Sequence, residues 1–154
     1  MLELIGPYDI FRLAHPGEAI CVTTNGIVKK DGSAVMGKGI ALSANRLFNL
    51  SPLLGVYLRK FGNRCFNMGM HQYAGFQYNI ITFPTKHHWR DRSDINLICK
   101  SCTELVAMCD KFGFSKCYLV PPGCSNGQLN YERDVRPYIA HLLDDRFIVV
   151  LSNL

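Results

Sequence analysis

The sequence has no long apolar run. None of its stretches approaches the roughly 20 consecutive apolar residues that a membrane-spanning helix needs. Residues 1–7 lack the basic start and apolar centre of a secretory signal peptide. Internal repeats, low-complexity tracts and linkers are also missing. We therefore expect one cytoplasmic domain that comprises residues 1–154.

Several catalytic and metal-binding patterns are absent as well. The sequence contains no G-x-S-x-G, no H-E-x-x-H and no catalytic pair of carboxylates. Its C-x-x-C pair, Cys99 and Cys102, lies inside a predicted helix and has no partner pair or histidine at zinc-finger spacing. We interpret these cysteines as core residues, and we expect neither a metal nor a cofactor. The total of 7 cysteines, an odd number, is typical of free thiols in a reducing compartment.

Acidic residues are outnumbered: 12 Asp and Glu stand against 17 Lys and Arg, which gives a formal net charge of +5. This balance favours an anionic ligand or a nucleic acid but does not choose between them. The hydrophobic share of 48% and the charged share of 19% are those of an ordinary globular protein. A chain of this length can bury a core without disulfides or metals.

Hydrophobic patterning predicts strands that alternate with helices. The expected strands are residues 1–5, 18–24, two or three short ones within 64–83, 117–120 and 147–151. The expected helices are residues 37–47, 51–61, one capped by Ser93 and ended by Gly113, and 131–143 with a bend at Pro137. This alternation predicts an α/β fold with a mixed, largely parallel sheet between helical layers.

A short glycine-rich segment, residues 35–41, carries the first functional signal; we name it the first glycine loop. A buried strand ends in Thr24-Asn25-Gly26, and ten residues after Gly26 the run Met36-Gly37-Lys38-Gly39 leads into a helix. Unpaired N–H groups at a helix start attract phosphate, and glycine permits close approach. The segment nearly matches the nucleotide P-loop, but Gly39 stands where the magnesium-binding hydroxyl belongs. A diphosphate cradle is favoured over a purely structural turn.

Two further segments carry polar signals. Residues 121–129, the second glycine loop, follow a buried strand and precede a helix, at the sheet edge where α/β proteins bind ligands. Taken alone, this loop is better explained as a plain turn, but together with the first glycine loop it could enclose a diphosphate. Residues 83–93 concentrate positive charge at another strand end, and there a partly buried Lys86 is a candidate nucleophile because burial and like charges favour the neutral amine. The alternative is a solvated basic loop with Trp89 packed as a lid.

Taken together, these residues resemble a macro domain, a three-layer α/β/α module with a mixed central sheet that binds ADP-ribose. Thr24-Asn25 with residues 35–41 resembles the family's strand-end asparagine and first phosphate loop, and residues 122–127 resemble its second loop. Residues 83–86 with Trp89-Arg90 resemble the branch of antitoxins that remove ADP-ribose from DNA and of terminal ADP-ribose glycohydrolases. The likeness covers nearly the whole chain.

The resemblance implies roles for particular residues. Lys86 is the expected catalytic group at C1″ of the distal ribose, and Asn25 holds that ribose. Asp9 and Ile10 are expected at the adenine, and Gly37 to Ile40 and Ser125 to Gln128 at the diphosphate. The full expected ligand-binding set is Asp9, Ile10, Thr24, Met36, Gly37, Lys38, Gly39, Ile40, Thr85, Pro122, Gly123, Cys124, Ser125, Asn126, Gly127 and Gln128.

Two departures from the family pattern stand out. Residues 26–34 form a longer stretch than the antitoxin pattern has, and Gly127 stands at the position of an Asp that assists the lysine in the glycohydrolases. The resemblance implies an enzyme that hydrolyses ADP-ribose derivatives at the distal ribose, removing ADP-ribose from modified nucleic acid or protein. The alternatives are an ADP-ribose 1″-phosphate phosphatase, a non-catalytic ADP-ribose-binding module, and a basic nucleic-acid-binding protein.

Overall fold

The computed structural model describes residues 1–152. Its elements follow one another along the chain as β1 (Leu2–Leu4), η1 (Ile10–Arg12), β2 (Ala19–Thr24), α1 (Gly39–Phe48), α2 (Ser51–Phe61), β3 (Asn67–Tyr73), β4 (Phe76–Pro84), α3 (Ile95–Phe112), β5 (Cys117–Leu119), η2 (Tyr131–Val135), α4 (Arg136–Ile139) and β6 (Phe147–Val150). Within residues 1–152, none of the helices combines the length and the apolar character needed to cross a bilayer.

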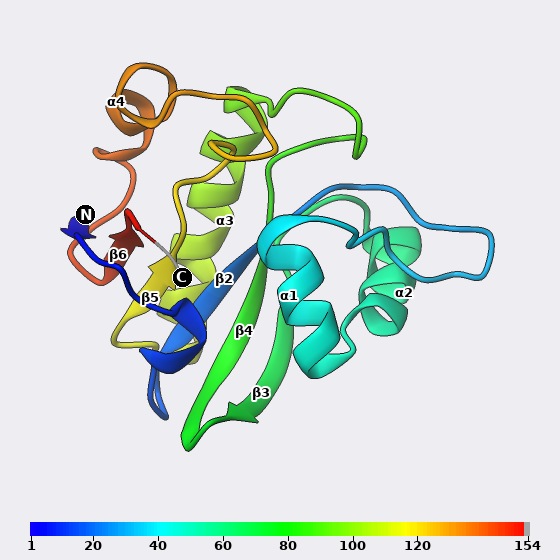
Figure 1. Cartoon of the computed structure of the whole chain (residues 1–154), viewed down its shortest axis with the longest axis horizontal. Helices are drawn as coiled ribbons and strands as arrows, with labels where there is room; N and C mark the ends of the chain where they lie inside the picture. The colour runs from blue at the N-terminus through cyan, green and yellow to red at the C-terminus, as the bar shows by residue number, and fades with distance from the viewer. Residues whose placement is uncertain (153–154) are drawn as a thin grey trace.

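The six strands form one mixed sheet in the order β1-β6-β5-β2-β4-β3 (Figure 1). Only β3 runs antiparallel to its neighbour β4, and the other neighbouring pairs are parallel. β2 pairs with both β4 and β5, and its residues from Ala19 to Val22 are fully buried. This explains its continuous apolar sequence, because a central parallel strand is covered on both faces.

Helices cover both faces of the sheet (Figure 1). Successive side chains of β2 point to opposite faces: Ile20 and Val22 join a core with α1, α2 and η1, whereas Ala19 and Cys21 join one with α3 and α4. The three-layer α/β/α arrangement expected from the sequence is thereby confirmed, with a mixed central sheet.

The expected helix over residues 131–143 is wrong in its extent. Residues Tyr131–Val135 form a π-helical turn, and the α-helix that follows, α4, ends at Ile139. Pro137 lies at the second position of α4. A proline has no N–H to donate to a preceding turn, so it is tolerated at a helix start and not in the interior.

Two helix starts also differ from the expectation. Asp94, not Ser93, caps α3, and its side chain accepts a hydrogen bond from the Asn96 N–H. Helix α1 begins at Gly39, since Lys38 has an extended backbone. Ser93 and the residues just before α1 are therefore left in loops that border the sheet's carboxyl edge.

Candidate functional site

A cavity of about 980 Å³ lies at the carboxyl ends of β2, β4 and β5, the edge where α/β sheets bind ligands. Both glycine loops contribute to its wall, and so does the segment after β4. The lining residues are Phe11, Thr23, Thr24, Asn25, Val35, Met36, Gly37, Lys38, Gly39, Ile40, Ala41, Leu42, Ser43, Thr85, Lys86, Trp89, Val120, Pro121, Gly123, Cys124, Ser125, Asn126, Gly127, Val150 and Leu151.

The first glycine loop lies open to the cavity. A Cβ added at Gly37 would meet no atom within 4 Å, so no other protein atom covers the main chain on this side. Gly39 has a φ of 59°, in the left-handed region that glycine adopts without strain. The start of α1 follows directly, where main-chain N–H groups have no partner within the helix. The wall can therefore donate hydrogen bonds to an anion that approaches closely.

The second glycine loop is packed tightly against the segment before α3. The Ser93 N–H donates to the Gly127 oxygen at 3.0 Å, and the Leu129 N–H donates to the Gly123 oxygen at 3.0 Å. A Cβ added at Gly127 would collide with Ser93 Oγ and with the Gly123 oxygen. The position therefore has no room for the aspartate that the glycohydrolases carry there.

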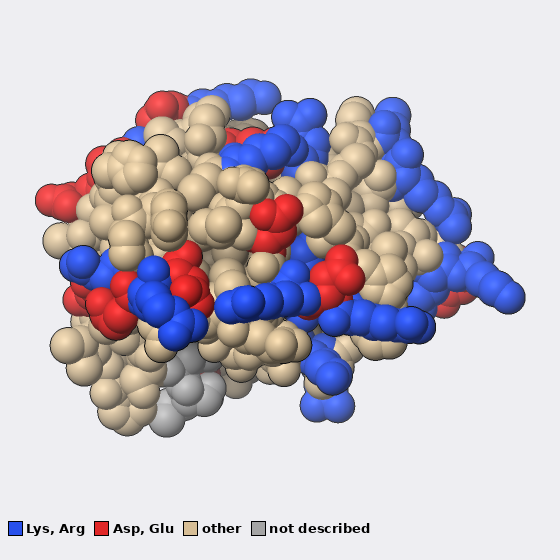
Figure 2. Space-filling view, turned by 90° about the horizontal axis from the view of Figure 1, so that it is seen from above, with Lys and Arg blue, Asp and Glu red and all other residues tan. Residues whose placement is uncertain are grey.

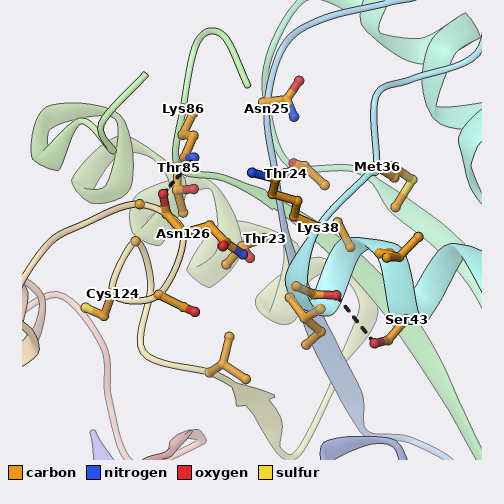
Figure 3. A pocket seen from close by; sticks show the side chains of 18 of the residues that line it. Thr23, Thr24, Asn25, Met36, Lys38, Ser43, Thr85, Lys86, Cys124 and Asn126 are labelled. Atoms are coloured by element: carbon orange, nitrogen blue, oxygen red, sulfur yellow. Dashed lines mark hydrogen bonds between the residues drawn. The ribbon is translucent and has the colours of Figure 1, made fainter. Parts of the chain in front are cut away.

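Lys86 connects the segment after β4 to the second glycine loop. Its Nζ donates to the main-chain oxygen of Asn126 at 3.1 Å (Figure 3) and also to that of Trp89 at 3.3 Å. Burial, and then the positive charge of Lys38, lower the pKa of the Lys86 amine below its usual 10.5. Figure 3 shows the Lys38 side chain reaching from the first glycine loop toward Lys86. The cavity thus holds two amines at one end.

Asn25 follows β2 and lies on the segment next to that of Lys86, because the main chains beyond β2 and β4 stay paired (Figure 3). Its Nδ2 donates to the Val35 oxygen at 3.1 Å, and its Oδ1 accepts from the Ile27 N–H at 3.0 Å. These bonds close the loop of residues 26–35 onto the start of the first glycine loop. An amide nitrogen carries two N–H groups, so Asn25 keeps one for a ligand.

Four residues of the expected set lie outside the cavity lining. Asp9 caps η1 by accepting from the Phe11 N–H at 3.0 Å, and Ile10 is fully buried. Pro122 and Gln128 belong to the second glycine loop but lie outside the lining too. The remaining expected residues, including Thr24, Met36, Ile40, Thr85, Cys124 and Ser125, line the cavity.

Phe11 lines the cavity, although no sequence motif indicated it. Its main-chain oxygen accepts from the buried Tyr78 hydroxyl at 2.9 Å, and its ring packs 6.0 Å from that of Phe48. The only signal in the sequence was its position beside Asp9 and Ile10. Trp89, 44% exposed, lies at the rim with the Arg90 guanidinium 5.0 Å from its ring centre.

The cysteines show no sign of catalysis or metal binding within residues 1–152. Cys102, on α3, is fully buried in the core, whereas Cys99 is only half-buried and lies outside the core, contrary to the expectation for this pair. Cys124 lines the cavity, but burial raises the pKa of its thiol to about 11, and its Sγ contacts the Pro122 oxygen at 3.2 Å. No three His, Cys, Asp or Glu side chains of these residues are grouped as a metal site requires.

Neither a family model nor a curated protein matches the chain. Solved structures do match it. The macrodomain of Mycobacterium tuberculosis DarG is 26% identical with a TM-score of 0.74, and the match covers 98% of this chain and 99% of that one. The macrodomain of Thermus aquaticus DarG is 22% identical with a TM-score of 0.70, covering 98% of each chain.

Thermosipho africanus DarTG, solved in complex with ADP-ribose, is 20% identical with a TM-score of 0.75. The match covers 99% of this chain but only 42% of that one, which is a longer protein. The fold and the resemblance of the sequence motifs point the same way. The chain has the macrodomain fold, and it resembles the macrodomains of the DarG proteins.

Proposed function

We propose that the chain binds ADP-ribose in this cavity and hydrolyses ADP-ribosylated substrates at the distal ribose. The two glycine loops supply main-chain donors on opposite sides of a space large enough for a dinucleotide-like ligand. The bound ADP-ribose of Thermosipho africanus DarTG, which shares the fold, supports this ligand.

The observation that carries the catalytic part is the placement of the Lys86 amine. It lies at the cavity wall, tethered to the Asn126 and Trp89 oxygens, with a pKa lowered by burial and by Lys38. A lowered pKa increases the neutral fraction of an amine, and a neutral amine is a nucleophile and a base. In the net reaction the bond from C1″ to the acceptor breaks. Water then supplies hydroxyl to C1″ and a proton to the acceptor.

The main rival reaction is removal of phosphate from ADP-ribose 1″-phosphate. One observation favours it: Lys38 and Lys86 bring two amines to the same end of the cavity, which suits a terminal phosphate dianion. In that reaction Lys86 only balances charge, so an arginine at position 86 preserves activity.

A nucleic acid is the acceptor that we favour for the ADP-ribose. Figure 2 looks onto the molecule from above Figure 1, and Lys and Arg side chains gather on this face over the end that carries α2 and residues 26–35. Lys29, Lys30, Arg59 and Lys60 are the exposed cations of these segments. A basic surface of this kind attracts phosphate backbones.

The test is a substrate panel of ADP-ribosylated DNA, ADP-ribosylated protein and ADP-ribose 1″-phosphate, with product release measured for wild type, Lys86→Ala and Lys86→Arg. We expect both variants to lose about 100-fold or more in rate on an ADP-ribosylated substrate, since guanidinium does not deprotonate at these pH values. Lys111→Ala, far from the cavity at the end of α3, is the control. Wild-type activity of Lys86→Ala on every substrate contradicts the proposal.

A further inference from the structure

Asn63 lies behind the wall of the cavity, in the turn that follows α2. The cavity lining does not include it. Neither its place in the chain nor the sequence motifs connect it with the site. Its contacts, however, reach both of the segments that carry Lys86 and Asn25.

These two segments are neighbours because β2 and β4 are paired. The register places Thr24 beside Pro84, and Asn25 and Lys86 come shortly after these ends. The two main chains stay together beyond the strands, where the Gly26 N–H donates to the His87 oxygen at 3.1 Å. The separation of Asn25 from Lys86 therefore depends on how this extension of the sheet is held.

The Asn63 amide occupies the space next to that extension. Its Nδ2 donates to the main-chain oxygen of Lys86 at 3.0 Å. A Cβ added at Gly26 would lie 3.0 Å from Asn63 Cγ and 3.0 Å from its Nδ2, so the amide packs directly against the residue that follows Asn25. One side chain thus contacts the main chain at Lys86 and the main chain just after Asn25.

The other end of the amide has no partner. Asn63 Oδ1 is buried and, among the described residues, accepts no hydrogen bond. A buried unpaired acceptor destabilises a fold, and exceptions in native proteins call for an explanation. Turning the amide over would place Oδ1 against the Lys86 oxygen, two acceptors face to face. The orientation is therefore set by the bond to Lys86.

Lys86 is consequently held at both ends. Its amine is tethered to the Asn126 and Trp89 oxygens, and its main-chain oxygen is tethered to Asn63. A displacement of about 1 Å at a reacting group reduces rates by about 100-fold in other enzymes. The bond from Asn63 prevents such a displacement at the main chain.

We propose that Asn63 is a positioning residue for Lys86: its amide fixes the Lys86 main chain relative to the Asn25 end of β2. The inference rests on the proposed hydrolase function. Asn63 does not line the cavity, so we expect its removal to change the reaction step and to leave ADP-ribose binding in place.

The experiment compares wild type with Asn63→Ala in single-turnover assays on the active member of the substrate panel. We expect the rate to fall about 10- to 100-fold while calorimetry gives one ADP-ribose per chain and a Kd within threefold of wild type. We also expect the rise of rate with pH to move to higher pH, because a loosened Lys86 amine becomes more hydrated and loses the burial that lowers its pKa.

Asn67→Ala is the matched control, because Asn67 also carries two local bonds, from the Gly69 N–H and from Asn79 Nδ2, but lies in β3 without contact to Lys86. It should keep the wild-type rate and pH profile. Asn63→Asp, nearly the same shape without the N–H, should behave as Asn63→Ala does. A loss of rate matched by an equal loss of binding stoichiometry, with an unshifted pH profile, indicates a merely structural role and overturns the proposal.

The outcome for Lys86→Ala distinguishes failure of the proposed hydrolase mechanism from failure of the positioning role of Asn63. Wild-type rates for Lys86→Ala contradict the catalytic role of Lys86 and, with it, the hydrolase mechanism. If Lys86→Ala is inactive but the rate of Asn63→Ala stays within threefold of wild type, the hydrolase mechanism is supported. The positioning role of Asn63 is then overturned.

Discussion

Lys86 and Asn25 lie on neighbouring segments at the cavity, and each keeps part of its hydrogen-bonding capacity for a ligand. Of the three N–H groups of a lysine ammonium, two are used on the Asn126 and Trp89 oxygens. Asn25 keeps one N–H beyond its bond to the Val35 oxygen. Each residue therefore has about one donor with which to orient the distal ribose.

For Asn25 we expect that replacement weakens turnover more than binding. Asn25→Ala should lower kcat about 10- to 100-fold and change the ADP-ribose Kd less, because orientation of the ribose is expressed mainly in the transition state. Asn25→Asp is the informative companion, since it can still accept from the Ile27 N–H but has no N–H to offer. A normal kcat with only a raised KM argues against this role.

At the scale of the element, the two glycine loops use glycine for different reasons. At Gly37 the space beside the main chain is empty and belongs to the cavity. At Gly127 the space is filled by Ser93 Oγ and the Gly123 oxygen. One glycine keeps room for a ligand, whereas the other permits the loop itself to fold, so their substitutions should have opposite consequences.

Gly37→Val should abolish most ADP-ribose binding without affecting the fold. The Cβ of the new side chain meets no protein atom within 4 Å, so the side chain projects into the space that an approaching phosphate needs. Loss of the charge-assisted bonds at this wall corresponds to roughly a 100-fold rise in Kd. Calorimetry measures the affinity and thermal unfolding the stability; unchanged affinity contradicts a ligand at this loop.

Gly127→Ala should instead destabilise the protein. Its methyl group collides with the Gly123 oxygen, which belongs to the main chain and cannot rotate away. Overpacking of this kind lowers the free energy of unfolding by about 1–3 kcal/mol. Denaturant titration of the two glycine variants side by side checks the contrast, which fails if Gly127→Ala is as stable as Gly37→Val.

At the scale of the whole molecule, the first strand is tied to the C-terminal part of the chain. β1 pairs with β6, and Glu3 accepts hydrogen bonds from Arg136 Nε at 2.9 Å and from the Tyr131 hydroxyl at 3.0 Å. The bond from Arg136 is the main cause that lowers the pKa of the Glu3 carboxyl below 4.5. The irregular segment at η2 and α4 is thereby anchored to the sheet edge.

Glu3→Gln should lower the free energy of unfolding at pH 7 by about 0.5–1 kcal/mol, a modest figure because Arg136 is partly exposed. The folded pKa of Glu3 is depressed, so the ionised carboxylate contributes fully above its ordinary pKa of 4.5 and loses this contribution as pH falls through the folded value. The two proteins should therefore converge in acid. Glu132→Gln, an exposed carboxyl in η2, is the control, and a difference that persists at low pH contradicts the linkage.

The sequence by itself determined the alternation of elements, the layers and the chemical character of the loops. Strands such as β2 and helices such as α3 show a characteristic pattern of apolar residues in the sequence. Glycine and asparagine at strand ends indicate turns and caps. These signals are local, so they are readable without the fold. The helix expected over residues 131–143 is wrong around Pro137, because a proline that lacks an N–H donor marks the start of α4 and not a bend inside a longer helix.

The tertiary structure alone decided what surrounds each functional side chain. Phe11 at the cavity wall, Ser93 beneath Gly127 and Asn63 against Lys86 are contacts between segments distant in the chain. Such contacts leave no periodic trace, because each depends on the pairing of β2 with β4 and on the loops that this pairing brings together. Local sequence patterns thus specify the helices and strands, whereas the geometry that would make Lys86 reactive exists only after the sheet has assembled.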